Sequence, residues 1–182
     1  MAKSVDPAAE LREAQDRIVA VWGQMGSAWG ISRTQAEVHS LLYIVGEPMS
    51  AEEIMERLQI SRGNASMSVR ALLEWGVISR THKRGDRREY YYAEADVWSM
   101  FRAILRERMK REVEPLLAAL FEIRDETEPR TRRDLPEDVI SHNKRLDELL
   151  DVLSTIEKLS QSFISPSGRG LRVAATMLSK VS

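Results

Sequence analysis

Apolar residues recur mainly at helical spacing along this chain, which predicts a mainly α-helical fold with little sheet. The clearest helix is expected over residues 62–75, between Ser61 as the N-cap and Gly76 as the residue that ends it. Its apolar positions follow at i, i+4, i+7 and i+8, namely Ala65, Val69, Leu72 and Leu73. One side of this helix is therefore expected to face a core.

The opposite side of the same helix is small and polar. It carries Gly63, Asn64, Met67, Ser68 and Arg70. Residues of this kind leave room for close approach, and several of them can hydrogen-bond base edges or phosphates. The pattern predicts a contact surface for nucleic acid.

A basic β-hairpin is predicted directly after this helix. Residues 77–81 alternate as a strand, and residues 89–92 supply a returning β-prone strand. Gly85 and Asp86 between them favour a turn. Upstream, residues 50–53 form a capping box that opens a short helix. Two helices joined by a tight turn and followed by a hairpin make a winged helix-turn-helix, with an ordinary αα-hairpin and a solvated basic loop as the alternative.

Positive charge is concentrated in this stretch. Seven basic side chains between Ser61 and Ala93 oppose three acidic ones, a surplus of four in a chain whose net charge is −1. Such a basic patch is the electrostatic footprint of a nucleic-acid contact. The candidate DNA-binding residues are Ser61, Arg62, Gly63, Asn64, Ser66, Met67, Ser68 and Arg70 in the helix, and Lys83, Arg84, Asp86, Arg87 and Arg88 in the hairpin. Among these, Asp86 is expected to hold an arginine through an ion pair.

Residues 33–93 resemble the winged-helix domain of MarR-type bacterial transcription regulators, in which a Gly-Asp-Arg-Arg sequence marks the wing. The same sequence stands here at residues 85–88. More narrowly, Ser61-Arg62-Gly63-Asn64 with Ser66, Met67 and Ser68, followed by Glu74-Trp75-Gly76, is similar to the GbsR branch, named for control of glycine betaine synthesis. The resemblance is specific in the recognition helix and the wing and weakens beyond them.

The resemblance implies a homodimeric repressor that binds a pseudo-palindromic double-stranded DNA operator. It also implies a small effector between the DNA-binding and dimer layers, and the GbsR branch suggests choline or another quaternary ammonium held by aromatic faces. Candidates for that effector site are Trp22, Trp29, Tyr43, Trp98 and Phe101. Aromatic residues in such positions are more often plain core.

Four longer helices are expected from periodicity and caps, over residues 7–28, 33–45, 95–123 and 137–163. Gly23 and Gly26 inside the first of them predict close packing of another backbone, with a frayed helix end as the alternative. Pro115 is expected to kink the third. Residues 125–136 are expected to form a linker or turn. Residues 165–170 are expected to form a flexible joint and residues 171–181 a short amphipathic tail, either docked on the dimer layer or disordered.

The last long helix carries more apolar surface than one winged-helix domain can cover. A partner subunit is the simplest cover, and the predicted dimer interface is Leu146, Leu149, Leu153, Ile156 and Phe163. An intramolecular hairpin with the preceding long helix is the alternative, and the two can coexist. The expected division is an N-terminal helix of the dimer layer over residues 1–30, the winged helix-turn-helix over 31–94 and a helical dimerisation region over 95–182.

The sequence offers little for metal, cofactor or enzyme chemistry. It has no cysteine, and its three histidines, His39, His82 and His142, are far apart. Phosphate-loop, dinucleotide-binding, nucleophile-elbow and zinc-protease motifs do not occur. No apolar run reaches the roughly 18 residues of a membrane span, and the N-terminus is no signal peptide, so a cytoplasmic protein is expected.

These observations predict a sequence-specific DNA-binding transcription regulator without a cofactor and without catalytic activity. Two alternatives stay open. One is a winged-helix module that binds an acidic protein partner, and the other is a non-specific nucleoid-type DNA binder. They differ in whether the protein prefers an inverted-repeat sequence.

Overall fold

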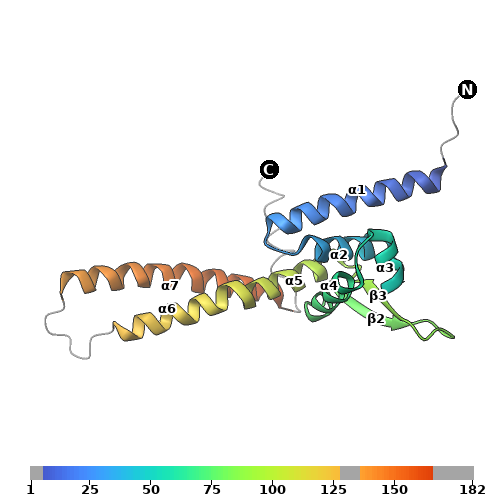
Figure 1. Cartoon of the computed structure of the whole chain (residues 1–182). Helices are drawn as coiled ribbons and strands as arrows, with labels where there is room; N and C mark the ends of the chain where they lie inside the picture. The colour runs from blue at the N-terminus through green and yellow to red at the C-terminus, as the bar shows by residue number, and fades with distance from the viewer. Residues whose placement is uncertain (1–5, 128–135, 166–182) are drawn as a thin grey trace, which may run out of the picture. The chain divides into compact units, whose positions relative to one another are not determined.

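The structure is a computed structural model that describes residues 6–127 and 136–165 (Figure 1). The chain folds as two compact units, Met1–Met100 and Phe101–Ser182. The predicted tail and most of the predicted 125–136 linker lie outside the described residues. The three-part division expected from the sequence is finer than these two units and stays a prediction.

Two capped helices open the first unit, α1 (Pro7–Ala28) and α2 (Arg33–Val45). Asp6 caps α1 and Ser32 caps α2, each through a side-chain oxygen that accepts a hydrogen bond from a backbone N–H of the first turn. Gly46 ends α2 in the left-handed conformation, with φ of 73°. Both helices have the bounds that their caps predict.

Glycines allow α1 to pack directly on α2. A Cβ built on Gly26 would lie 2.5 Å from the Cβ of Ala36. One built on Gly23 would lie 2.6 Å from the Cγ of Glu37. Such distances are far inside van der Waals contact. A larger residue at position 26 would push the helices apart, whereas the flexible Glu37 side chain can move away from one at position 23. The predicted close packing is confirmed, with side-chain atoms of Ala36 and Glu37 nearest and the Ala36 Cα 3.9 Å from the Cβ position of Gly26. The frayed-end alternative is wrong, because α1 continues to Ala28.

The predicted helix-turn-helix consists of α3 (Ala51–Leu58) and α4 (Arg62–Glu74). The capping box is present, because Ser50 Oγ accepts from the N–H of Glu53 at 3.3 Å and the Glu53 carboxylate accepts from the N–H of Ser50 at 2.6 Å. These hydrogen bonds, above all the one from the Ser50 backbone, lower the pKa of Glu53. Gln59 adopts the left-handed conformation, with φ of 53°, where α3 ends.

Three short antiparallel strands form the hairpin and its base, in the order β1–β3–β2. β2 is Ile78–His82 and β3 is Glu89–Ala93, with Thr81 opposite Tyr90. β1 (Met49–Ser50) pairs with the other edge of β3. The sequence predicts β2 and β3 but not β1, because a two-residue strand has no alternation to detect.

The core of the first unit draws on α2, α3, the strands and the segments beside them (Figure 1). Its most deeply buried large side chains are Tyr90, Leu41, Leu42, Ile54, Val38 and Val77. The predicted stripe of α4 adds Ala65, Val69 and Leu72, which are all buried. This shared core holds α4 and the hairpin on a common base.

The second unit is a helical hairpin of α6 (Glu114–Glu126) and α7 (Glu137–Ile164). α5 (Val97–Arg108) contains the division between the units and continues into one π-helical segment, η1 (Met109–Val113). The sequence predicts one helix kinked at Pro115, and an irregularity is present just before this residue. Proline lacks an N–H and crowds the preceding turn, which favours the wider hydrogen-bonding pattern there.

α6 and α7 pack through Leu117, Leu146 and Leu150, with Val113, Leu120 and Leu153 against them. The intramolecular hairpin that the sequence left open is therefore present. Leu146 is 6% exposed inside it, which corrects its assignment to a dimer interface, because its side chain already fills this core. Thr127 Oγ1 donates to Asn143 Oδ1 at 2.6 Å, and Arg124 pairs with Asp147 at 2.6 Å, so polar contacts set the register of the two helices.

Candidate nucleic-acid interface

The solvent-facing side of α4 carries most of the contact residues predicted for this helix. Arg62, Gly63, Asn64, Ser66, Met67 and Arg70 are all exposed. Met67, at 64%, is the most exposed large apolar side chain of this helix. Ser61 is exposed at the N-cap and accepts a hydrogen bond from the N–H of Asn64 at 3.3 Å, so its first role is to start the helix.

Ser68 departs from the expectation for α4. It is 6% exposed and shares the buried side of the helix with Ala65 and Leu72. Residues three and four positions apart lie on one helical face, and Ser68 has that spacing from both neighbours. Its assignment to the exposed contact surface is therefore corrected. In its buried place, a small side chain allows α4 to lie close to the rest of the core.

The hairpin is ordered by a compact network around Asp86. The Asp86 carboxylate accepts from the backbone N–H of Arg88 at 2.9 Å and from the Arg88 guanidinium at 2.6 Å. The Tyr90 hydroxyl donates to the same carboxylate at 2.7 Å and accepts from the Arg88 guanidinium at 2.7 Å. The Lys83 ammonium lies 4.1 Å from the centre of the Tyr90 ring, a cation–π distance. The ion pair predicted for Asp86 is thus present and places Arg88.

The network keeps both members of its ion pair charged. Hydrogen bonds from the Arg88 side chain and backbone, and then from Tyr90, hold the pKa of Asp86 far below its ordinary range. The same contact with Asp86 raises the pKa of Arg88 and also raises that of the Tyr90 phenol. Asp86 is therefore an anion at every pH where DNA binding is measured, and it orients the cation beside it.

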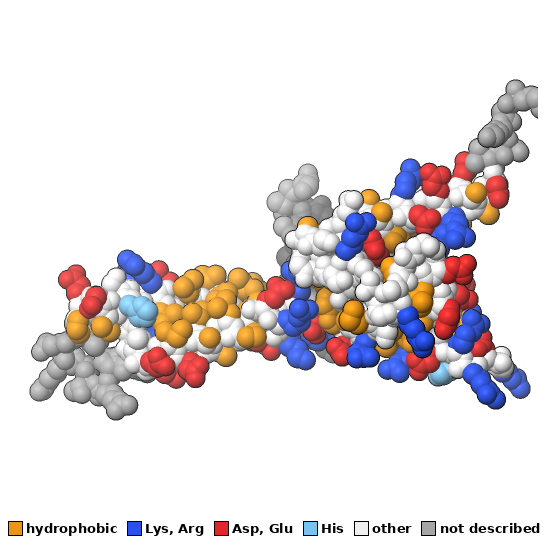
Figure 2. All heavy atoms as spheres, viewed as in Figure 1, with side chains coloured by type: hydrophobic (Ala, Val, Ile, Leu, Met, Phe, Trp, Pro, Cys, Tyr) orange, Lys and Arg blue, Asp and Glu red, His pale blue; other side chains and the backbone are white. Residues whose placement is uncertain are grey.

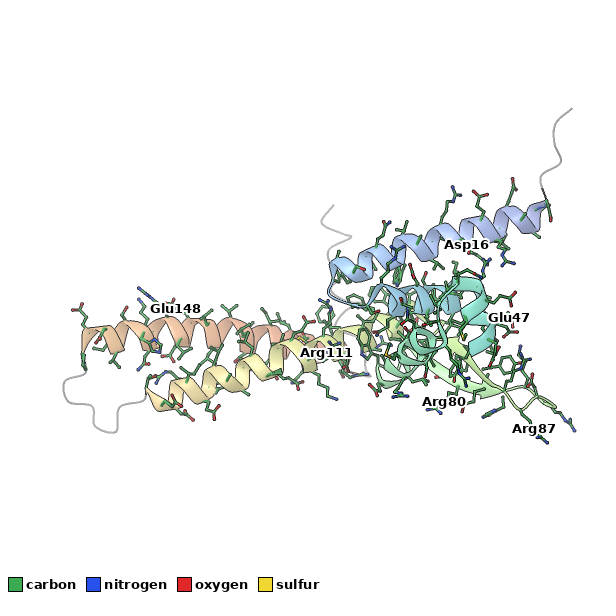
Figure 3. The ribbon with its side chains drawn as sticks, viewed as in Figure 1. Asp16, Glu47, Arg80, Arg87, Arg111 and Glu148 are labelled. Carbon is green, nitrogen blue, oxygen red and sulfur yellow. The ribbon has the colours of Figure 1, made fainter. Side chains whose placement is uncertain are left out.

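The other cations of the hairpin, Lys83, Arg84 and Arg87, are exposed. Figure 3 shows Arg87 at the tip of the hairpin and Arg80 nearer its base. In Figure 2, blue side chains gather at this end of the first unit. Arginine forks bind two phosphate oxygens at once, so this arrangement suits a polyanion.

A cleft of about 520 Å³ lies between α3, α4 and the hairpin strands. Arg62 and Arg70 line it from α4, and Arg80 lines it from β2. Glu89, also in the lining, pairs with Arg80 at 3.4 Å and accepts from the Tyr91 hydroxyl at 2.9 Å. The hydrogen bond from Tyr91 is the main reason that the pKa of Glu89 is lowered, and Arg80 adds to it. Three guanidinium groups from two elements therefore share one hollow beside α4.

Sequence reasoning counted Arg80 in the basic surplus but did not select it as a site residue. The signal that identifies it is strand register, because Arg80 lies opposite Tyr91 in the hairpin and both residues line the cleft. Directly opposed residues of an antiparallel pair lie on the same face of the sheet. Knowing the register would therefore have placed Arg80 beside α4.

Of the five aromatic residues predicted for an effector site, two lie together. Trp22 and Tyr43 flank His39, with ring centroids 6.4 Å from its ring in each case. The other three are exposed by more than a third: Trp29, Trp98 and Phe101. Phe101 belongs to the second unit.

His39, between these two rings, is a buried residue of α2. It is 4% exposed, and its Nε2 has no hydrogen-bond partner. Burial lowers the pKa of His39 to about 4, because the charged imidazole would lose its solvation. The ring is therefore neutral near pH 7 and contributes to packing between α1 and α2.

No three His, Asp or Glu side chains in the described residues are placed to hold a metal ion. Nor does any helix among residues 6–127 and 136–165 have the length and apolar character needed to cross a bilayer.

We define the basic surface as the exposed cations of α4 and the hairpin: Arg62, Arg70, Arg80, Lys83, Arg84, Arg87 and Arg88.

The segment of the chain that carries the basic surface is similar to a known protein family. Residues 29–89, which include the helix-turn-helix and most of the hairpin, match the model of the MarR family. One relative is the HTH-type transcriptional repressor GbsR of Bacillus subtilis (strain 168), 26% identical over 144 residues that cover 79% of each chain. Another is the putative HTH-type transcriptional regulator YvaV of the same organism, 25% identical over 96 residues, or 53% of this chain and 54% of the relative.

A solved structure supports the fold. The crystal structure of a transcriptional regulator aligns with a TM-score of 0.55 and 23% identity, over 83% of this chain and 95% of that one. MarR family members are non-enzymatic DNA-binding regulators, so the prediction that this chain is no enzyme is confirmed. Residues 29–89, with the helix-turn-helix and most of the arginine-rich hairpin, are thus similar to the MarR family, and the chain as a whole is similar to GbsR.

Proposed function

We propose that this protein is a homodimeric transcriptional repressor of a pseudo-palindromic operator, with α4 of each subunit in the major groove and each hairpin along the adjacent minor groove. The observation that carries the proposal is the basic surface, which stands beside the exposed polar side of α4 on one folded unit. The relatives support it, because both are named as HTH-type regulators and one as a repressor. Such a role belongs in the cytoplasm.

The cations of the basic surface act on the DNA backbone. Arg88 is already oriented by Asp86 and Tyr90, so it loses little side-chain freedom when it binds a phosphate or a narrowed minor groove. If the dimer neutralises about six to ten phosphates, its affinity falls about 10³- to 10⁵-fold between 50 and 200 mM salt.

Exposed side chains of α4 act on base edges. Asn64 suits adenine through a bidentate hydrogen bond, and Met67 offers an apolar contact to a thymine methyl. Arg62 and Arg70 suit guanine or phosphate, and Ser66 suits several bases. Sequence preference therefore comes from the exposed side of α4, whereas most of the affinity comes from the cations around it.

The proposed dimer rests on apolar surface in the second unit. α7 carries two apolar stripes, and only the one with Leu146 and Leu150 packs on α6. The other has heptad spacing and is 43–57% exposed; it consists of Leu149, Val152, Ile156 and Leu159. Leu116 and Ile123 of α6 are also exposed, and their helical positions turn them to the same side of the hairpin. Figure 2 shows the orange side chains along this unit.

A second copy of the chain is the proposed cover for this face. Contiguous apolar surface of this extent is uncommon on monomers, and a self-complementary face suits a two-fold dimer. Among the interface residues predicted from the sequence, Leu149 and Ile156 lie on the exposed stripe, whereas Leu153 and Phe163 are half-buried. Pairing two winged-helix units gives the two-fold symmetry that a pseudo-palindromic operator requires.

Release by a small effector, such as choline or another quaternary ammonium, is proposed from the family resemblance. Trp22 and Tyr43 beside His39 are the aromatic pair that supports it, and they are half-buried. Isothermal calorimetry with choline and with glycine betaine tests this part. Heat of binding together with weaker operator affinity is expected, and no heat with no change in affinity would remove the effector from the proposal.

Selection of bound sequences from random duplexes at physiological salt tests the function as a whole. An inverted repeat with half-sites about one helical turn apart, roughly 34–36 Å, is expected. Binding without a preferred sequence would identify a non-specific nucleoid-type protein. Absence of duplex binding would favour a module that docks an acidic protein.

Two substitutions then divide the surface by role. Arg88→Ala is expected to weaken all duplexes about equally and to reduce the salt dependence, whereas Asn64→Ala relaxes preference at one base pair. Arg33→Ala is the matched control, because it removes an exposed arginine of α2 that pairs with Glu37 away from the basic surface. Equal operator affinity for all variants and the parent in a gel-shift titration would exclude this surface.

A further inference from the structure

Met67 differs from every other methionine in the described residues. It is 64% exposed, whereas Met100 and Met109 are 6% and 7% exposed. The three remaining described methionines are partly buried: Met25, Met49 and Met55. Oxidants in solution therefore reach the Met67 thioether more readily than any of these others.

The neighbours of Met67 on α4 leave its sulfur open to solvent. Its neighbours one turn away on the same face include Gly63, which has no side chain, and Asn64, which is exposed. Nothing bulky shields the sulfur from that direction. Arg70, one turn further along, adds a positive charge that attracts anionic oxidants such as hypochlorite.

The chain has no cysteine, so an oxidant cannot act on it by forming a sulfenic acid or a disulfide. Methionine is the sulfur that this chain offers to two-electron oxidants. We propose that Met67 is a reversible oxidation site through which peroxide or hypochlorite lowers operator binding. This inference rests on the proposed function, because its output is DNA affinity.

The chemistry is a balanced oxygen transfer. The Met67 sulfur donates an electron pair to one oxygen of hydrogen peroxide, an S–O bond forms, the O–O bond breaks and water leaves. Sulfur is oxidised by two electrons and the peroxide is reduced by two. Methionine sulfoxide reductases reverse the step with two thiols, which become a disulfide as the oxygen leaves as water.

The product changes the DNA contact without disturbing the core. The sulfoxide oxygen is a polar acceptor where the proposed partner is a thymine methyl, and it must lose hydration to enter the groove. Because Met67 lies outside the buried stripe of α4, the fold does not depend on its apolar character. Loss of one good base contact corresponds to about tenfold weaker binding per half-site.

The experiment uses the full chain and the operator from duplex selection. The protein is treated with graded hydrogen peroxide or hypochlorite, sulfoxide at each methionine is measured by peptide mass spectrometry, and operator affinity is measured by fluorescence anisotropy. We expect Met67 to be oxidised before the five other methionines of the described residues and circular dichroism to stay unchanged. Affinity of the dimer for an operator with two half-sites is expected to fall about 10²-fold in step with oxidation of both subunits. A mixture of reductases for both sulfoxide epimers is expected to restore affinity.

Two variants make the test decisive. Met67→Leu is expected to bind the operator but to keep its affinity after oxidation, whereas Met25→Leu, a change at a partly buried methionine of α1, stays as sensitive as the parent. Oxidation of Met67 no faster than Met100, or unchanged affinity with Met67 fully oxidised, would overturn the inference. A loss of affinity in oxidised Met67→Leu as large as in the oxidised parent would also overturn it. Failure of the untreated protein to select any operator would instead count against the proposed function.

Discussion

The two units of this protein bury the same kind of side chain but differ in the surface that lies beside the core. In the first unit, Val38, Leu41 and Ile54 are fully buried, and much of the surface around α4 and the hairpin is cationic. In the second, three leucines form a small core between α6 and α7, while residues such as Val152 and Leu159 are more than half exposed. The first unit therefore presents a cationic surface beside its core, and the second presents an apolar face. Apolar side chains of α1, such as Leu11 and Val21, are exposed as well.

The difference indicates two kinds of partner. A cationic surface attracts a polyanion over a distance, and its binding is weakened by salt. An apolar helical face gains most by excluding water, which a complementary face of the same kind does best. We therefore propose that the operator binds the first unit and that the partner subunit packs on the apolar face of the second unit.

The largest effect is expected from a charge on the exposed stripe of α7. Ile156→Glu buries a carboxylate in the proposed interface, so the dimer is expected to dissociate. Affinity for an inverted repeat then falls about 10²-fold or more, because the two winged-helix units no longer bind the two half-sites as one molecule. Sedimentation velocity and gel shift measure the two effects. Gln161→Glu, which adds the same charge at an exposed polar position of α7, is the control and stays dimeric. A dimer that tolerates Ile156→Glu would place the subunit interface elsewhere.

The first unit holds a buried titratable group, His39, that makes its stability depend on pH. The pKa of His39 is about 4 in the folded chain against an ordinary 6.5, so the unfolded chain takes up the proton first as pH falls. The stability contributed by neutral His39 is fully present above pH 6.5 and is lost between pH 6.5 and about 4. The loss amounts to about 2 kcal/mol between pH 7 and pH 5.

Urea unfolding measured across this pH range tests the assignment of the buried histidine. His39→Gln is expected to flatten the dependence of unfolding free energy on pH, because glutamine does not titrate. His82→Gln, a change at an exposed histidine of β2, is the control. The range ends at pH 5 because Asp86 and Glu53, whose folded pKa values are lowered, lose their own contributions at lower pH. Equal slopes for parent and His39→Gln would show that the ring is solvated.

The smallest effects separate two glycines of the first unit. Gly26→Ala places a methyl 2.5 Å from Ala36 and is expected to cost about 1–2 kcal/mol, because overpacking outweighs the gain in helix propensity. Gly63→Ala meets only Ser61 Oγ at 3.9 Å and is expected to stabilise α4 by about 0.5–1 kcal/mol. Thermal unfolding of both variants measures the opposite shifts. Stabilisation by Gly26→Ala would show that α1 can move away from α2.

Local signals predicted most of the helices. Side-chain caps at Asp6, Ser32 and Ser61 mark the starts of α1, α2 and α4, because each satisfies a backbone N–H within the same few residues. The ion pair between Asp86 and Arg88 was predictable for the same reason, since the two residues are neighbours in the turn. Contacts that form within a few residues need no knowledge of the fold.

The features that could not be predicted from the sequence depend on which helices and strands contact one another. β1 exists because Met49 and Ser50 lie against the edge of β3, and Arg80 joins the cleft because the strand register turns it toward α4. Leu146 could not be assigned to the intramolecular core or to a partner while the position of α6 was unknown. Ser68 was misplaced because a small polar side chain is compatible with either side of a helix.

Caps, periodicity and charge are properties of neighbouring residues, so they were enough to predict most of the helices, the hairpin, the basic surplus and the surplus apolar surface on the last helix. The division of that surface depends on long-range packing: Leu146 and Leu150 pack on α6, while Leu149 and Ile156 stay exposed. Two stripes on one helix have the same periodicity, and they differ only in what lies against them. Periodicity therefore shows that a face must be covered, and packing shows which part of it the chain covers alone.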